Sequence, residues 1–494
     1  MAEAVEIVTA YTQIPYSVFA TELAGSLKKD FQNEIDEIMK YYEVYKKGAE
    51  FTTEGSGGDY VPSDLRFKKI RDLIDKEARF LFSIPPTFTV NPNTDSINER
   101  QKEINTQLNE FLSSTLEKIQ FNSDLVKAAK DCFIGKRVAC ILNFNDKEGI
   151  TATFLNSTEF LYQFEGKKLS KIIAIFILQD SSNKAEQVIK KKVYSMENDG
   201  YCYVEEALYT GTGEILEDGR IEKTKTLFTR IPAVVIINDG LTNDVRGMSE
   251  VETLTSEESY YSKLSNADID AGRKSMNPIR YTIDASDSST QNLSSSPGSF
   301  WDLQSTSTSS DPHTAQAGML EASMNYSAPL KTTLDRIENN MFSQLEIPNI
   351  NSEKLQGVIT SGKTLKALYW SLIVRCNEKM LTWGPALQYI SEVILEGAKL
   401  YPEAARLMSS IEVPDSEVHV RVENNYPLPE DEAEEKSVDL AEIAAQTMSR
   451  KSYMKKWRNL TDKECDTELQ QIAIERQLLE DSFMPPSDSE DLEE

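Results

Sequence analysis

The sequence is poor in the side chains that build metal and redox sites. Its 494 residues include two histidines and five cysteines, and no two cysteines form a CxxC pair. The cysteines are scattered along the chain, at Cys132, Cys140, Cys202, Cys376 and Cys465. Zinc sites need closely spaced ligands, and a complete disulfide framework needs an even number of cysteines. We therefore expect reduced thiols, no metal site and no cofactor.

Long apolar runs and a basic surplus are missing as well. No run of about 18 apolar residues occurs, so no membrane-spanning helix is expected. Residues 1–16 lack the basic start and apolar centre of a secretory signal. Acidic residues outnumber basic ones by 80 to 53, which gives a net charge of −27. This balance argues against a surface that wraps nucleic acid, because such binding replaces counterions with clustered Lys and Arg. It is compatible with a surface that DNA slides past, and it is also common among soluble proteins.

Helical spacing of apolar residues dominates the first part of the chain. It predicts helices over 21–46, 97–116 and 124–133, and a further helix that Ser63 caps and Pro85 ends. These helices are amphipathic, so they need a partner layer on which to bury their apolar faces.

From residue 137 to residue 239 the apolar period shortens to about 2. Segments rich in Val, Ile, Tyr and Phe are separated by turn signals such as Asn145-Asp146 and Asp199-Gly200. Because these strands follow one another without helices between them, we predict an antiparallel sheet at 137–239 that packs on the preceding helices. The predicted fold class is α+β rather than alternating βαβ.

Two helices are expected next, on either side of a small insert. The first begins at a capping box formed by Ser249 and Glu252, and the second begins with Ser327 as its cap and ends before Pro348. The insert contains Ser- and Thr-rich loops and two strand-like stretches, at 277–284 and 299–304.

A long helix is predicted over 361–400. Its apolar residues, among them Leu372 and Leu387, recur at steps of three or four, so this face is expected to be buried. Pro385 lacks a backbone donor and predicts a kink near 380–384. After it we expect one strand at 417–423, two or three amphipathic helices at 432–447, 451–457 and 461–479, and an acidic disordered tail at 480–494.

A nucleotide-binding pattern lies just before this helix. Gly357 to Thr364 reads GVITSGKT, which matches the phosphate-binding loop GxxxxGKT. In nucleotide hydrolases that loop follows a buried strand, and a second strand carries the Asp that holds Mg²⁺. Here the preceding EIPNINSEKLQ is polar and broken by Pro348, and no βαβ alternation surrounds it. We therefore favour a polar loop before a helix start, with a nucleotide site as the alternative.

Three stretches of the sequence carry a family resemblance, in the same order along the chain. They are LRFKKIRDLIDKEARFLFSIPPTFTV at 65–90, SGKTLKALY at 361–369, and YPLPEDEAEEKSVDLAEIAAQTMSRKSYMKKWRNLTDKECDTELQQIAIER at 426–476. In these stretches the chain resembles the portal (head-to-tail connector) proteins of tailed bacteriophages, of the long non-contractile-tail type. The Ser-rich insert at 286–311 has no residue-by-residue match.

The resemblance implies a structural protein without catalytic activity that forms a ring, a dodecamer in this family, at one capsid vertex. It implies a portal-type subunit with an α/β wing that includes the sheet, a two-helix stem, a small β-containing clip, a channel loop and a helical crown. The wing would comprise residues 1–247, the long bent helix 361–400 and the return strand 401–426. The stem would be 248–275 with 324–347, the clip 276–323, the channel loop 348–360 and the crown 427–479.

The resemblance also implies partners. Double-stranded DNA would pass through the channel without sequence readout. A terminase packaging motor and head-completion or adaptor proteins would dock at the clip, and capsid and scaffolding proteins would surround the ring, with no membrane involved. The protein would be assembled in the host cytoplasm and reside in the virion, at the portal vertex.

Two sets of residues are candidates for these contacts. The DNA-facing set in and beside the channel loop is Asn349, Asn351, Glu353, Lys354, Gln356 and Lys363. The set in the clip, for docking of the motor and connector proteins, is Arg280, Trp301, Asp302 and Gln304. Two other function classes stay open: a nucleotide hydrolase that uses Gly357–Thr364, and an acidic scaffold or adaptor.

Adding ATP tests the nucleotide alternative. We expect no rise in melting temperature, because a protein gains stability by mass action only from a ligand that its folded state binds. Thermal unfolding of the wild type and of Lys363→Ala, with and without ATP and Mg²⁺, measures this. A rise in the wild type that vanishes in the variant would establish a nucleotide site.

Overall fold

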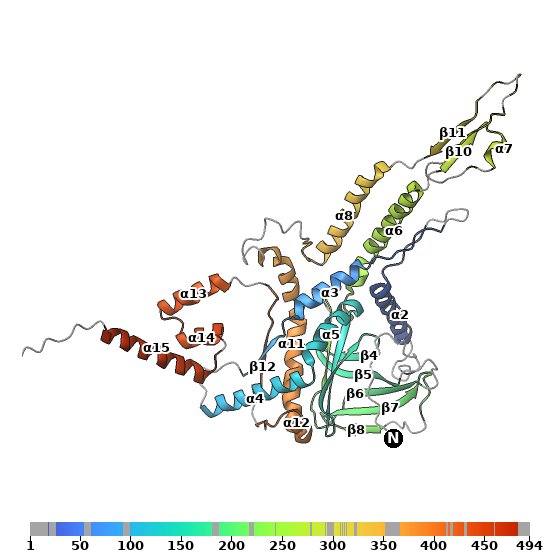
Figure 1. Ribbon diagram of the computed structural model, residues 1–494. Coiled ribbons are helices and arrows are strands. Elements are labelled where there is room, and N and C mark those ends of the chain that lie inside the picture. Colours follow the sequence, from blue (N-terminus) through green and yellow to red (C-terminus); the bar gives the residue numbers. More distant parts are fainter. Residues whose placement is uncertain are drawn as a thin grey trace, which may run out of the picture. The chain divides into compact units, whose positions relative to one another are not determined.

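The computed structural model in Figure 1 describes most of the chain. The described residues are 18, 26–53, 61–91, 99–179, 187–216, 222–242, 244–276, 279–291, 293, 301–306, 308, 310, 312, 314–320, 324–350, 366–411, 413–414, 418–428, 432–458 and 460–482. Helices and antiparallel strands occupy different stretches of the sequence, so the predicted α+β class is confirmed. The chain divides into two compact units, Met1–Asn349 with Tyr369–Pro427, and Ile350–Leu368 with Leu428–Glu494.

From Ser26 on, the described part of the first unit opens with the helices α2 (Ser26–Lys47), α3 (Lys69–Phe82), α4 (Glu99–Lys118) and α5 (Phe121–Gly135). The central one is α5, which contacts the other three helices of this set. Its apolar residues, including Leu125 and Phe133, are fully buried. The prediction that Ser63 caps a helix is wrong, because α3 begins at Lys69 and residues 61–68 form no helix. The Ser63 hydroxyl instead donates a hydrogen bond to Asp270, about 200 residues later in the sequence.

The strands predicted between residues 137 and 239 are present, and all their described pairings are antiparallel. They divide into two sheets instead of one. The first has the order β3-β2-β9, with β3 Gly149–Asn156, β2 Arg137–Asn145 and β9 Ala233–Ile237. The second has the order β4-β5-β6-β7-β8, with β4 Phe160–Glu165, β5 Lys168–Gln179, β6 Val188–Met196, β7 Cys202–Thr210 and β8 Glu222–Lys225.

The interiors of these sheets explain their sequence patterns. β5 is apolar from Ile172 to Ile177 and buried on both faces, as its lack of alternation predicts. One face of the five-stranded sheet packs against Val18 and Phe31. In the other sheet, α5 contacts β2 and β3, so the helical layer covers it as expected.

A pair of helices, α6 (Glu250–Met276) and α8 (Ser327–Gln344), brackets the small insert. They run antiparallel, since Glu257 near the start of α6 accepts hydrogen bonds from Asn340 and Gln344 near the end of α8. α8 follows a 3₁₀ turn, η1 (Met324–Tyr326), and begins at Ser327, so Ser327 lies inside the helix and is not its cap.

The insert holds a two-stranded antiparallel sheet of β10 (Ile279–Ile283) and β11 (Gln316–Leu320), with a single turn of helix, α7 (Asp287–Thr290). The predicted strand at 277–284 is thus present. The predicted strand at 299–304 is wrong for its described part, because residues 301–304 pair with no strand. An isolated bridge joins Ala285 to Ser305 just after them.

The long helix α11 (Trp370–Leu400), drawn in orange in Figure 1, belongs to the first unit. Leu372 is 2% exposed and Leu387 is fully buried, so the predicted buried face is confirmed. Residues 366–368 are also helical, whereas 351–365 lie outside the described residues. The helix continues through Pro385 to Leu400.

Two short elements complete the first unit beyond α11. The helix α12 (Pro402–Met408) contacts β3, and the predicted return strand is β12 (Val420–Glu423). It pairs antiparallel with β1 (Thr87–Val90), and Thr87 lies opposite Glu423. The two paired strands are therefore more than 300 residues apart in the sequence.

The second unit contains the three helices predicted near the C-terminus: α13 (Glu432–Ala444), α14 (Arg450–Arg458) and α15 (Asp462–Ser482). Trp457 Nε1 donates to Asp439 Oδ2 at 2.6 Å and joins α14 to α13. Because α15 extends to Ser482, the expected disordered tail is helical at 480–482, and its remainder lies outside the described residues. A search of the described helices for one that could span a membrane finds none.

Candidate functional site

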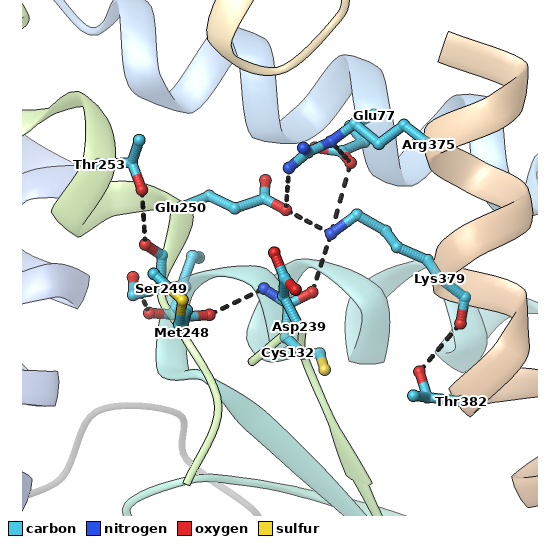
Figure 2. Close-up of polar contacts among 12 residues, drawn as sticks. Glu77, Cys132, Asp239, Met248, Ser249, Glu250, Thr253, Arg375, Lys379 and Thr382 are labelled. Carbon is cyan, nitrogen blue, oxygen red and sulfur yellow. Dashed lines mark hydrogen bonds and ion pairs between the residues drawn. The ribbon is translucent and has the colours of Figure 1, made fainter. Parts of the chain in front are cut away.

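Four ionisable side chains from three helices meet in the interior of the first unit (Figure 2). α3 contributes Glu77, the first residue of α6 is Glu250, and α11 contributes Arg375 and Lys379 one turn apart. The Arg375 guanidinium donates to both carboxylates, with Nε 2.8 Å from Glu77 Oε1 and Nη2 3.0 Å from Glu250 Oε1. We call these four residues the ion cluster.

Lys379 extends the ion cluster to the sheet and to α5. Its ammonium donates to Glu250 Oε1 and, at 2.8 Å, to Oδ1 of Asn238, which directly follows β9. It also lies 4.1 Å from the centre of the Phe133 ring of α5. Since Lys379 is 8% exposed and Glu77 is completely buried, water screens these interactions little.

The start of α6 is fixed by a cap next to the ion cluster. Ser249 Oγ accepts a hydrogen bond from the N–H of Val251 at 3.2 Å and donates to the carbonyl of Ile134 at 2.6 Å. Ser249 therefore caps the helix as predicted, but its bond goes to Val251 and not to Glu252, the donor in the predicted capping box. It ties the N-terminus of α6 to the last turn of α5, which holds Glu250 in the interior.

The two carboxyl groups of the ion cluster have very different acidities. Burial, and next the charge of Glu250, raise the pKa of Glu77 to about 8. Burial alone would also raise the pKa of Glu250, but Lys379 and Arg375 outweigh it and lower this pKa to about 2. At neutral pH Glu77 is then a neutral acid and Glu250 an anion.

A shared proton also explains two otherwise unsatisfied atoms. Oε2 of Glu77 and Oε2 of Glu250 are both buried, and neither accepts a hydrogen bond from a described protein donor. A protonated Glu77 supplies the missing donor, because a neutral carboxyl can hydrogen-bond to the adjacent carboxylate.

A polar stripe along α6 forms a second constellation. Glu258, Ser262, Asn266 and Asp270 are spaced four residues apart, which places them along one face of the helix. Each accepts a backbone hydrogen bond, at 3.0, 3.3, 2.9 and 3.1 Å, and the donors are, in that order, the N–H groups of Ile70, Phe67, Leu65 and Ser63. We call this contact the α6 ladder.

The α6 ladder takes the place of a neighbouring strand for residues 61–68, and through Ile70 it satisfies a donor in the first turn of α3. These N–H groups would otherwise be unpaired beside a helix, and an unpaired buried donor costs roughly 1–3 kcal/mol. The side chain of Asn266 also donates to the Leu65 carbonyl at 2.7 Å, and Ser63 Oγ donates to Asp270 at 2.7 Å. Ser63 therefore acts in holding this segment on α6.

Only one of the predicted channel-loop residues lies in the described part of the chain. Asn349 donates from Nδ2 to Oδ1 of Asn339 in α8 at 2.9 Å. The other five, Asn351, Glu353, Lys354, Gln356 and Lys363, lie outside the described residues, as does the GVITSGKT pattern. The described residues just before it, up to Ile350, form a turn and coil, not the strand that a phosphate-binding loop requires.

The predicted clip residues are all described, and two of them are brought together. The guanidinium carbon of Arg280, in β10, lies 5.7 Å from the centre of the Trp301 ring. Asp302 and Gln304 are exposed, and the carbonyl of Gln304 accepts a hydrogen bond from the N–H of Ser286. Arg280 and Trp301 thus form a cation–π pair at the sheet of the insert.

The ion cluster and the α6 ladder were both missed in the sequence. One local signal existed for each: Arg375 and Lys379 interrupt the apolar face of the long helix, and four polar residues recur at steps of four on α6. Neither signal indicates which distant residues these side chains contact in the fold. All five cysteines are buried free thiols, and no group of potential metal ligands occurs in the described ranges.

A family model described as phage portal protein, SPP1 Gp6-like, matches residues 26–478, from the first residue of α2 into α15. A comparison with curated proteins finds no match.

Neutral substitutions of the two carboxyl groups test the ion cluster. Glu77→Gln should not lower the free energy of unfolding at pH 7, since glutamine resembles the neutral acid that the folded protein holds there. Glu250→Gln should lower it by about 3–5 kcal/mol, because it leaves two buried cations without their main anion. Denaturant unfolding measures both values, and equal losses would show that the proton assignment is wrong.

The same pair of proteins gives a pH test. A carboxyl whose pKa is raised by folding stabilises the protein at low pH and loses that contribution as pH rises toward about 8. As pH rises from about 4.5 to about 8, the free energy of unfolding of the wild type should therefore fall relative to that of Glu77→Gln, by at most about 1.4 kcal/mol per pH unit. Glu159 and Asp131, whose pKa values burial also raises, are common to both proteins and cancel in the difference.

Proposed function

The chain belongs to the phage portal protein family of the SPP1 Gp6-like kind, and from this premise we propose that it is a subunit of the conduit through which phage DNA is packaged and ejected. Membership implies a structural, ring-forming protein of the virion. The observation that carries the proposal is the extent of the match, which covers residues 26–478 in one stretch. In the proposed conduit, DNA passes along the ring axis without sequence readout, and the ring is a dodecamer.

We assign the parts of the subunit as follows. The wing comprises 1–247, 361–400 and 401–426, and the crown comprises 427–479. α6 and α8 are the stem, the insert with β10 and β11 is the clip, and residues 348–360 are the channel loop. The antiparallel course of α6 and α8 supports this assignment, because two helices of that length can hold an insert roughly 30 Å from the main body.

A conduit needs a stem that keeps its direction while DNA moves past it. The ion cluster supports this role, since it joins the base of α6 to α3 and α11 through charge-assisted hydrogen bonds. The α6 ladder fastens a further segment along the same helix. Both contacts restrict the angle between the stem and the wing.

The channel loop is proposed to face the DNA. A net charge of −27 per subunit repels the duplex and keeps it from binding firmly. Lys354 and Lys363 would touch phosphates in passing, and Asn349, Asn351, Glu353 and Gln356 would line the loop. Contacts to phosphates carry no sequence information, so any DNA can pass.

The clip is proposed as the docking site for the terminase motor and for head-completion or adaptor proteins. The Arg280–Trp301 pair supports this, because Arg and Trp are enriched among residues that dominate protein interfaces. Asp302 and Gln304 would add polar contacts. Capsid and scaffolding proteins would surround the ring, which is assembled in the host cytoplasm before it becomes the portal vertex of the virion.

The hydrolase alternative has no specific support. No observation on the described residues favours nucleotide chemistry, and the energy for packaging would come from the docked motor. The proposed subunit therefore needs no catalytic residue of its own.

Electron microscopy of the purified protein tests the proposed assembly. Negatively stained particles should be rings with a central hole, because a heterologous interface that closes on itself gives cyclic symmetry. A protein that stays monomeric at every concentration and hydrolyses ATP would support the enzyme alternative and contradict the conduit.

A packaging assay with purified rings, motor and DNA tests the site residues. Rings with Lys354→Ala and Lys363→Ala should bind the motor normally but package or retain less DNA, because phosphate contacts are lost.

Rings with Trp301→Ala should lose motor binding by about tenfold or more, as expected for an aromatic anchor. The exposed Ser310→Ala is the matched control in the insert. Normal packaging by both variants would refute the two assignments.

A further inference from the structure

α11 has a second apolar face, opposite the one that is buried in its own subunit. Between Trp370 and Pro385, the exposed residues of this helix are Trp370, Ser371, Val374, Asn377, Glu378, Leu381, Thr382 and Pro385. Trp370 is 65% exposed and Leu381 is 75% exposed. An exposed tryptophan is uncommon, because its large apolar surface favours burial.

Helical geometry places the apolar members of this face in one stripe. With 3.6 residues per turn, Trp370, Val374, Leu381 and Pro385 lie within an arc of about 60°. We call them the α11 stripe. Leu372 and Trp383 on the opposite side are buried in the subunit, at 2% and 1% exposure. A helix that is apolar on both sides is normally covered on both sides.

The composition of this face points to a protein partner and away from DNA. Among its eight exposed residues only Glu378 is charged, whereas 27% of the whole chain is charged. Depletion of charge together with an exposed tryptophan is typical of the centre of a protein interface. The face carries no Lys or Arg, so it offers nothing to a phosphate backbone.

We infer that the α11 stripe is a contact surface for a second copy of this chain, the next subunit of the ring. This inference rests on the proposed function. Each copy carries a charge of −27, so neighbouring copies repel one another and must meet where charge is sparse. The α11 stripe is such a place.

The contact is heterologous. In a ring of more than two subunits, each copy presents one surface to the subunit before it and a different surface to the subunit after it. The α11 stripe therefore packs against a surface of the neighbour other than the neighbour's own α11 stripe. Burying Trp370 and Leu381 in this way removes their apolar surface from water and holds adjacent subunits together.

Photo-crosslinking identifies what covers the α11 stripe. Full-length protein with Leu381→p-benzoylphenylalanine is assembled and irradiated, and Leu241→p-benzoylphenylalanine, at a position that is 82% exposed in the loop after β9, is the matched control. A covalent dimer from position 381, at clearly higher yield than from position 241, is expected. Crosslinks from position 381 confined to the same chain would overturn the inference.

A substitution experiment gives an independent measure. The double variant Trp370→Ala and Leu381→Glu should raise the concentration at which half the rings dissociate by about tenfold or more. Its far-UV circular dichroism should match the wild type, because these side chains are exposed in the subunit. Leu241→Glu, the control for an added charge, should leave assembly unchanged. Mass photometry measures the assembled fraction.

The outcomes separate the two proposals. If the wild type forms no ring, the proposed function fails and this inference fails with it. If the wild type and the double variant form rings of equal stability, the conduit stands and the inference alone is refuted.

Discussion

The contact on which the rest of the first unit depends is the ion cluster of Glu77, Glu250, Arg375 and Lys379. Placing four ionisable groups in an interior is expensive, and apolar residues of the same volume often give equal or greater stability. What charged groups add is direction: Arg375 donates to two fixed oxygens, so α3, α6 and α11 meet in one arrangement. A proton on Glu77 completes the network and leaves a single buried anion, Glu250, between two cations.

The other features of this unit lie on the helices that the ion cluster joins. α6 starts at Glu250, and twenty residues farther along the same helix Asp270 ends the α6 ladder that holds the segment at Ser63. The same α11 that supplies Arg375 and Lys379 on its inner side carries the α11 stripe on its outer side. In the proposed ring, one helix would thus connect the stem of its own subunit to the next subunit. A load on the stem would then be shared around the ring.

Much of the fold could be predicted from the sequence, because the signals are local. Alternation and turn residues gave the strands, and apolar spacing gave most helices within a few residues. Ser63 shows where this fails: a serine before an apolar run resembles a helix cap, but its partner is Asp270, about 200 residues away. The ion cluster fails for the same reason, since Arg375 and Glu77 are 298 residues apart and lysine or arginine on a helix is unremarkable. Of the residues predicted to line the channel loop, Asn349 lies in the described part of the chain, where it donates a hydrogen bond to Asn339.

A cryo-EM reconstruction of the assembled protein tests the central claim most directly, that this chain builds a DNA conduit around its α6–α8 pair. If the claim is right, the map will show a closed ring around an open channel, with α6 and α8 along the channel axis and the segment after Ile350 facing the lumen. A ring without a continuous channel, or one with α6 and α8 on its outer rim, would contradict it.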